Sequence, residues 1–224
     1  MSDVIIACDF NSRLELFEFL NKFGNVKPFI KIGMELYYKE GYELVKKLKS
    51  NGYKIFLDLK LCDIPNTVYK AMLVLKNLNI DFINVHVFGG VEMMKAAKKA
   101  FIDTNTKVIG VTIMTSIDEY MLKNELCINL PLVETVSSYI ENVKSAGLDG
   151  IVCSVYEANI VKEKGLISIT PGIRYEDNDK GDQKRVSTPM LAKKLGSDYI
   201  VVGRPITQSK DPLTTYLKFK EDFI

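Results

Sequence analysis

Histidine and cysteine are scarce in this sequence, and long hydrophobic runs are absent. A single histidine, His86, occurs among 224 residues. Because a serine–histidine–aspartate triad would have to use this one residue and no GxSxG segment is present, a hydrolase of that type is not favoured. The four cysteines form no CxxC pair and have no metal-ligand spacing. We therefore interpret them as small packing residues of a reduced protein.

Charge and hydropathy disfavour two classes of partner. The chain has 30 Lys+Arg against 28 Asp+Glu, a formal net charge of +2, whereas nucleic-acid binders need a concentrated basic face. The longest apolar stretches fall far below the ~20 residues that a membrane helix needs. The apolar run at residues 4–8 is too short for a signal peptide. We expect no nucleic-acid partner, no membrane partner and a cytoplasmic location.

Short apolar, β-branched runs alternate with segments of helical spacing. The runs lie at residues 4–9, 28–33, 53–60, 80–87, 107–114, 148–154, 166–172 and 198–204. The helical segments lie at residues 34–50, 67–79, 91–101, 132–146, 155–164 and 188–195, and longer loops are expected at 115–129 and 175–187. This alternation predicts a parallel sheet, and eight strand candidates are typical of a TIM barrel.

We therefore expect residues 1–224 to form a single (β/α)8 TIM-barrel domain. A doubly wound α/β sheet is the structural alternative. It is disfavoured because no GxGxxG follows the first apolar run and no GxxxxGK[ST] occurs anywhere.

Charged residues gather at the carboxyl ends of the predicted strands. Side chains two residues apart on a strand point to the same face. Asp58 and Lys60 in YKIFLDLK therefore share the face opposite the leucines of that segment, and Lys31 and Asp9 occupy the corresponding places on the first two strands. Because buried charges are costly unless paired, two acids and two lysines converging inside a barrel indicate a candidate site. A structural ion-pair network remains the alternative.

Several other polar residues have a simpler interpretation. Asn84 and His86 share a face of the fourth strand, and we interpret His86 as a hydrogen-bonded barrel residue. Cys62 lacks an evident activating partner and is interpreted as packing. The acids lie beside lysines, which compete with a cation for them, so no metal site is expected.

Two glycine–arginine segments follow the last two strands. TPGIR at residues 170–174 contains Arg174, and VVGRPIT at residues 201–207 contains Gly203 and Arg204. TIM barrels often bind phosphate at these positions, and arginine makes bidentate contacts with phosphate oxygens. We favour a phosphate site over a turn that only closes the barrel.

An ordered set of motifs resembles the orotidine 5'-phosphate decarboxylase family in its bacterial form. DLKLCDIPNT at residues 58–67 is similar to the family's DxKxxD array followed by IPxT. The resemblance continues through ACDF at 7–10, FIKIGMEL at 29–36, INVH at 83–86, MTS at 114–116, TPGIR at 170–174, GDQKRVSTP at 181–189 and VVGRPIT at 201–207. It implies a cofactor-free carboxy-lyase that converts orotidine 5'-monophosphate into uridine 5'-monophosphate in pyrimidine biosynthesis.

The resemblance also implies roles for single residues. Lys60 would protonate C6 of the pyrimidine as carbon dioxide leaves, and Asp58 would lie beside the departing carboxylate. Lys31 and Asp9 would hold the ribose hydroxyls, with Lys31 also a member of the charged array. Thr115 would contact the pyrimidine ring.

Further residues are implied at a subunit interface and around the phosphate. Asp63 would complete the catalytic array and would, with Ile64 and Thr67, reach the site of the other subunit of a homodimer. The phosphate grip and its closing loop would comprise Arg174, Gln183, Gly203 and Arg204.

Two rival functions are weighed against this one. Hexulose-6-phosphate synthase and keto-gulonate-phosphate decarboxylase resemble the same DxKxxD pattern, but they are magnesium-dependent and carry a glutamate where this chain has Lys31, a residue that would repel the metal. A non-catalytic nucleotide-binding or scaffold protein is the second rival, and the intact set of Asp58, Lys60 and Asp63 argues against it.

Overall fold

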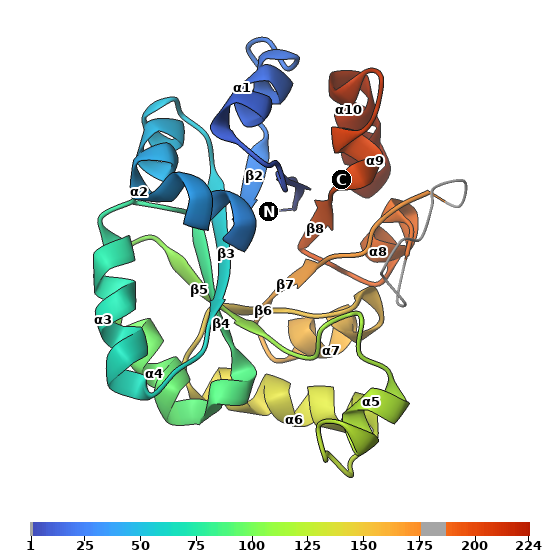
Figure 1. The fold of residues 1–224 in the computed structure, drawn as a ribbon. Coiled ribbons are helices and arrows are strands. Elements are labelled where there is room, and N and C mark those ends of the chain that lie inside the picture. Colours follow the sequence, from blue (N-terminus) through green and yellow to red (C-terminus); the bar gives the residue numbers. More distant parts are fainter. Residues whose placement is uncertain (1, 176–186) are drawn as a thin grey trace.

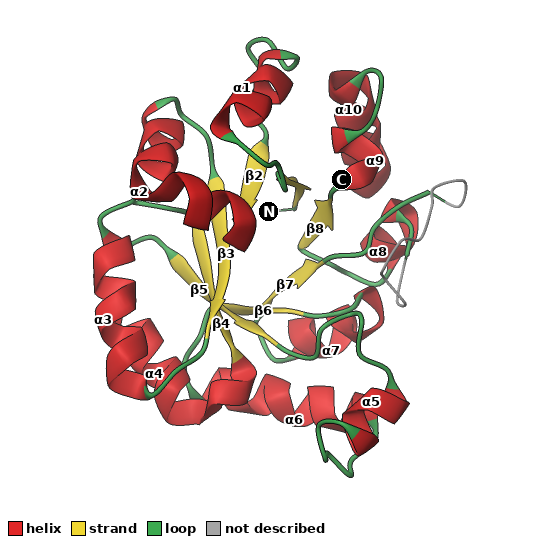
Figure 2. Ribbon diagram, in the orientation of Figure 1, coloured by secondary structure: helices red, strands yellow, loops and turns green. Residues whose placement is uncertain are grey.

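The computed structural model describes residues 2–175 and 187–224. Within them, eight parallel strands close into one barrel in chain order, with β8 hydrogen-bonded to β1. The strands are β1 (Asp3–Ala7), β2 (Phe29–Gly33), β3 (Ile55–Leu61), β4 (Phe82–His86), β5 (Lys107–Val111), β6 (Gly150–Val152), β7 (Ile167–Thr170) and β8 (Tyr199–Val202). Helices surround these strands (Figures 1 and 2). The predicted TIM barrel is confirmed.

The helices agree with the predicted segments in most places. They are α1 (Arg13–Asn21), α2 (Met34–Ser50), α3 (Pro65–Lys76), α4 (Gly90–Ala100), α5 (Glu119–Asn124), α6 (Leu132–Ser145), α7 (Ala158–Glu163), α8 (Pro189–Lys194), α9 (Arg204–Thr207) and α10 (Pro212–Phe223), with 3-10 turns η1 (Val87–Gly89) and η2 (Val155–Glu157). The predicted helix at residues 155–164 is divided into η2 and α7. The loop predicted at residues 115–129 contains α5, so that prediction was wrong in part.

Helix α2 has the predicted length but is not continuous. Gly41 interrupts it with a φ of 71° and a ψ of −163°. A residue with a side chain is strained in this left-handed region, and glycine is not. The segment therefore consists of two helical pieces joined at Gly41, which helical spacing alone does not reveal.

Side chains on the strands divide into two apolar clusters, as the alternation predicted. The inner cluster fills the barrel with Ile5, Ala7, Phe29, Phe56, Phe82, Ile109, Ile169 and Val201. The outer cluster, against the helices, contains Ile30 and Ile32 of β2 and Leu57 and Leu59 of β3. Phe82 packs at 5.1 Å from Phe29 and at 6.0 Å from Phe56, measured between ring centroids. The barrel interior is therefore closed by an apolar plug below the carboxyl ends of its strands.

Aspartates fasten the amino-terminal end of the barrel. Asp81, Asp149 and Asp198 directly precede β4, β6 and β8, and each accepts a backbone N–H from near the start of the preceding strand at 2.8 Å. Lys98 also pairs with Asp149 at 2.5 Å. This end of a TIM barrel generally serves stability, and the carboxyl end carries the functional residues.

Candidate active site

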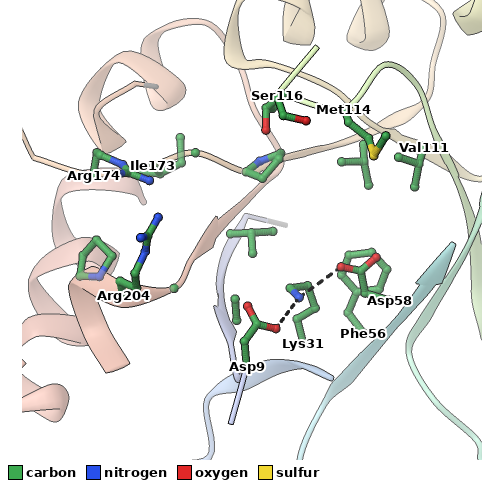
Figure 3. Close-up of a pocket in the computed structure, with 18 of the residues that line it drawn as sticks. Asp9, Lys31, Phe56, Asp58, Val111, Met114, Ser116, Ile173, Arg174 and Arg204 are labelled. Carbon is green, nitrogen blue, oxygen red and sulfur yellow. Dashed lines mark hydrogen bonds and ion pairs between the residues drawn. The ribbon is translucent and has the colours of Figure 1, made fainter. Parts of the chain in front are cut away.

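A cavity of about 790 Å³ opens at the carboxyl ends of the strands. This volume lies within the range of small-molecule sites. Phe56, a member of the inner apolar cluster, forms part of its lining together with Val111, Val152 and Val201. The cavity thus combines these apolar side chains with charged ones, among them Asp9, Lys31 and Asp58 (Figure 3).

Lys31, Asp9, Asp58 and Lys60 form a continuous charged array in this cavity. The Lys31 ammonium lies 3.1 Å from Oδ1 of Asp9 and 3.2 Å from Oδ2 of Asp58 (Figure 3). The Lys60 ammonium lies 2.7 Å from Oδ1 of Asp58. The strands β1, β2 and β3 therefore bring together the four residues that sequence parity placed on one side.

The array holds Asp58 and Lys31 in their charged forms. Burial raises the pKa of Asp58, but Lys31 and Lys60 outweigh this effect, so the pKa lies below the usual carboxyl value. Burial likewise opposes the charge of Lys31, and Asp58 and Asp9 reverse this, so the Lys31 pKa is raised. Opposite charges at this distance favour ionisation of both partners. The cavity therefore carries fixed charges of both signs above its apolar floor.

Lys60 is the more exposed of the two array residues on β3, and it lines the cavity. Its side chain is 29% exposed, against 11% for Asp58. It remains in contact with the buried carboxylate while its ammonium is accessible to a ligand. An ammonium held in this way can both stabilise a developing negative charge and donate a proton.

Arginines line the opposite side of the cavity. Arg174, which is buried, follows β7, and Arg204 follows β8. In Figure 3 both lie across the cavity from Lys31 and Asp58. Gly203, directly before Arg204, lies close to the first strand, where an added Cβ would meet that of Ala7 at 3.5 Å. This side can accommodate an anionic group, away from the charged array.

Not every predicted site residue lies in this cavity. Thr115 does, beside Ser116. Asp63, Ile64 and Thr67 are exposed around the start of α3 and do not line the cavity that the described residues form. Gln183 falls outside the described residues. The cavity of one chain thus contains the array and the arginines, but not the residues predicted to serve a second subunit.

Sequence reasoning missed some residues of the site. Ser116 and Gln208 line the cavity; Ser116 stood in the MTS segment without an assigned role, and Gln208 follows VVGRPIT. Asn84 is fully buried and donates to Asp58 at 2.6 Å. Its face on β4 was identified from alternation, but its contact with the array was not.

The cysteine interpretation was correct for two residues and wrong for two. Cys8 and Cys153 are buried, and burial raises the pKa of the Cys8 thiol. Cys62 and Cys127 are exposed. The two exposed cysteines lie in the connections that follow β3 and α5. Cys62 is therefore not a packing residue in the described part of the chain.

The surroundings of His86 and the placement of possible metal ligands also bear on the sequence-based expectations. The Nδ1 of His86 accepts the Phe88 N–H at 3.4 Å, as a hydrogen-bonded barrel residue would. Burial and the nearby Lys60 lower the pKa of His86, so its ring is neutral at pH 7. Across residues 2–175 and 187–224, no group of three or more His, Cys, Asp or Glu is placed to hold a metal ion. In the same residues, no helix combines the length and hydropathy needed to cross a membrane.

Comparison with curated proteins gives relatives over nearly the whole chain. Orotidine 5'-phosphate decarboxylase of Geobacillus kaustophilus is 48% identical over 229 residues, covering 98% of this chain and 93% of the relative. The protein of the same name from Malacoplasma penetrans is 46% identical over 227 residues, covering 99% and 98%. A family model described as "Orotidine 5'-phosphate decarboxylase / HUMPS family" matches residues 2–219.

Solved structures agree with the sequence relatives. Orotidine 5'-phosphate decarboxylase from Lactobacillus acidophilus has a TM-score of 0.90 and 40% identity, covering 100% of this chain and 99% of that one. The Methanocaldococcus jannaschii enzyme, complexed with inhibitor BMP, has a TM-score of 0.80 and 26% identity with the same coverage. The chain belongs to the orotidine 5'-phosphate decarboxylase / HUMPS family, and the expectation of a carboxy-lyase drawn from its motifs is confirmed.

Proposed function

We propose that this enzyme converts orotidine 5'-monophosphate into uridine 5'-monophosphate and carbon dioxide without a cofactor. The observation that carries the proposal is the Asp58 carboxylate held between Lys31 and Lys60 in a cavity with an apolar floor, with arginines across the cavity. The names of the relatives support the same reaction.

Lys60 is the proposed proton donor. The bond between C6 and the carboxylate carbon breaks, carbon dioxide leaves, and the electron pair remains on C6 in the plane of the ring. The Lys60 ammonium stabilises this charge and then gives it a proton, which forms the C6–H bond of the product. Because the uncatalysed step is very slow, the barrier reduction must lie towards the top of the ~8–23 kcal/mol range of enzymes.

Asp58 has a proposed role beside the departing carboxylate. Its lowered pKa keeps it ionised at neutral pH, although burial opposes this. A substrate carboxylate bound next to it experiences repulsion, which disappears when carbon dioxide is lost. Asp58 also fixes the position of the Lys60 ammonium at 2.7 Å.

The other cavity residues are proposed to bind the parts of the nucleotide that do not react. Lys31 and Asp9 hold the ribose hydroxyls, and Thr115 contacts the pyrimidine ring. The proposed phosphate grip is formed by Arg174, Gln183, Gly203 and Arg204. Because these contacts lie far from C6, their binding energy can assemble the site, and a substrate without phosphate should lose turnover as well as affinity.

We further infer a homodimer in which Asp63, Ile64 and Thr67 reach the partner's site. Exposed apolar side chains support this interface: Met34, Ile64, Phe88 and Met114 follow the carboxyl ends of the consecutive strands β2 to β5. Exposed apolar side chains gathered at one end of a barrel favour an interaction surface there. It lies at the same end of the barrel as the cavity.

The extent of the domain and the location of the enzyme stay predictions. We infer one domain over residues 1–224, because all the described strands close into one barrel. The expected location is cytoplasmic.

The test is an absorbance assay of orotidine 5'-monophosphate with purified enzyme and a metal chelator. Loss of substrate with uridine 5'-monophosphate as product is expected. Inactivity under chelation, together with turnover of a sugar phosphate once magnesium is restored, would move the assignment to the magnesium-dependent branch.

The variant Lys60→Ala tests the proposed proton donor. It should bind uridine 5'-monophosphate, because the phosphate and ribose contacts remain, and it should lose turnover. Turnover equal to that of the wild type would overturn the role of Lys60, and loss of product binding would show that the variant changed more than the proton donor.

A further inference from the structure

The end of β3 departs from regular strand geometry at Lys60. Its φ is 50°, in the left-handed region that disfavours residues with a side chain. The pairing with β4 shifts at the same place: Leu57 pairs with Ile83 and Leu61 with Val85, so four steps along β3 match two along β4. Bulges of this kind redirect side chains next to active sites. Such a conformation persists only where neighbouring groups hold it.

Asn84 of β4 holds this bulge from the neighbouring strand. Its side chain is fully buried, and its Oδ1 accepts the backbone N–H of Lys60 at 2.7 Å. Its Nδ2 donates to Oδ1 of Asp58 at 2.6 Å. The amide orientation follows from these partners, because a backbone N–H only donates and a carboxylate only accepts. One side chain thus joins the strained backbone of Lys60 to the carboxylate of Asp58.

These bonds determine which oxygen of Asp58 faces which lysine. Oδ1 accepts from Asn84 and also from the Lys60 ammonium at 2.7 Å, while Oδ2 lies 3.2 Å from the Lys31 ammonium. Rotation of the carboxylate would break both contacts of Oδ1. Asn84 is not among the cavity-lining residues of the described chain, so any effect it has on a ligand passes through Asp58 and Lys60.

We propose that Asn84 is a positioning residue, which holds the Lys60 ammonium and the Asp58 carboxylate in the relation that proton delivery to C6 requires. This inference rests on the proposed decarboxylation. An asparagine suits the position because it offers one donor and one acceptor on a planar group. Leucine offers neither, and aspartate offers a donor only when it is protonated.

The first test is Asn84→Leu, which keeps the approximate volume of the side chain and removes both hydrogen bonds. We expect kcat for orotidine 5'-monophosphate to fall about tenfold to a hundredfold, because small misplacements of a reacting group have effects of this size. The dissociation constant of uridine 5'-monophosphate should change little, because the proposed ribose and phosphate contacts are intact.

Thr106→Val is the matched control. It removes a buried hydrogen bond, from Thr106 Oγ1 to the Ile80 carbonyl at 2.7 Å, at the opposite end of the barrel. It should lower the melting temperature and leave kcat unchanged. The comparison separates a general loss of stability from a loss of positioning.

The second test is the pH profile of Asn84→Asp. Asp58 and Lys60 contact this position directly, Lys31 pairs with Asp58, and His86 interacts with Lys60. At low pH the new carboxyl keeps a proton and can donate to Asp58 as the amide does. As the pH rises it ionises and repels Asp58. We therefore expect kcat of this variant to decrease with rising pH over a range in which the wild type shows no decrease.

The outcomes separate this inference from the proposed function. Wild-type enzyme that does not decarboxylate orotidine 5'-monophosphate would overturn the function itself. If the wild type is active but Asn84→Leu keeps the wild-type kcat, only the positioning role would be overturned. The same holds if Asn84→Leu loses kcat and affinity for uridine 5'-monophosphate to the same extent. The positioning role would also be overturned if Asn84→Asp had the pH profile of the wild type, or if neither variant folded. In the second case Asn84 would be needed for the stability of the barrel rather than for the reaction.

Discussion

Replacing Lys31 by methionine should destabilise the protein to an extent that depends on pH. Lys31 lies between Asp9 and Asp58, at 3.1 Å and 3.2 Å, and only 12% of its side chain is exposed. Methionine keeps an apolar chain of similar length in that place but removes the charge. The Asp58 carboxylate, which is 11% exposed, then retains its ion pair with Lys60 at 2.7 Å and loses its ion pair with Lys31.

The expected loss can be bounded from these contacts. Removing one partner of a buried ion pair costs about 3–5 kcal/mol. Because Lys60 remains and Asp9 is 60% exposed, we expect the lower end, about 3 kcal/mol at pH 7. For a domain of 150–250 residues each kcal/mol lowers the melting temperature by roughly 2–4 °C, which gives a decrease of about 6–12 °C.

The pH dependence follows from the ionisation of Asp58. In the wild type, burial raises the pKa of Asp58, but Lys31 and Lys60 lower it by more than burial raises it. The pKa in the folded state therefore lies below the pKa in the unfolded state. The contribution of Asp58 to stability is therefore present above the unfolded pKa and lost as the pH falls through the folded pKa. Without Lys31 burial has more weight and the pKa of Asp58 rises. The penalty should be larger at pH 8, where Lys31 is charged and Asp58 is ionised, and should shrink as the pH is lowered and the carboxyl takes up a proton.

Calorimetric melting of the wild type and Lys31→Met between pH 5 and pH 8 measures this effect. The control is the double variant Lys31→Met/Asp58→Asn, which buries no carboxylate and should be more stable at pH 8 than Lys31→Met alone. A penalty that is the same at every pH, or a double variant that loses the sum of both single losses, would refute the electrostatic reasoning.

Two further predictions concern the other end of the barrel and its proposed interface. Asp149→Ala leaves the Val108 N–H without its 2.8 Å acceptor and should lower the free energy of unfolding by about 2 kcal/mol with kcat unchanged. Urea denaturation and steady-state kinetics measure these two quantities, and a lower kcat in folded protein would contradict the prediction. Ile64→Lys introduces a charge among the exposed apolar side chains of the proposed interface and should shift the proposed dimer towards monomer in sedimentation velocity. An unchanged sedimentation coefficient at low protein concentration would exclude this interface.

The strands and the charged array could be predicted because they depend on a local repeat. Alternation along β3 assigns Leu57 to the helices and Asp58 to the interior whatever the rest of the chain does, and the structure agrees. Helical spacing of apolar residues also marks α1 and α10, which were not among the predicted helices. Tyr216, Phe219 and Phe223 are buried at helical spacing in α10.

Other features depend on contacts between strands and leave no local signal. The bulge at Lys60 arises where β3 and β4 lose their common register. Nothing in the letters DLK distinguishes a strained lysine from a regular one, so the double contact of Asn84 could not be foreseen. Helix α5 lies in a polar stretch that resembles a loop; it begins where the side chain of Asp118 accepts the Met121 N–H at 2.9 Å.

The position of the array above the apolar plug connects its stability to its chemistry. Phe56 and its neighbours exclude water from below, and charges interact more strongly in such surroundings than in water. The same exclusion makes each unpaired charge costly, so removing one partner of an ion pair in the array destabilises the protein. A variant that removes Lys31, Asp58 or Lys60 therefore changes stability and proton delivery together. Rates for such variants are interpretable only when they are compared at temperatures well below each variant's own melting temperature.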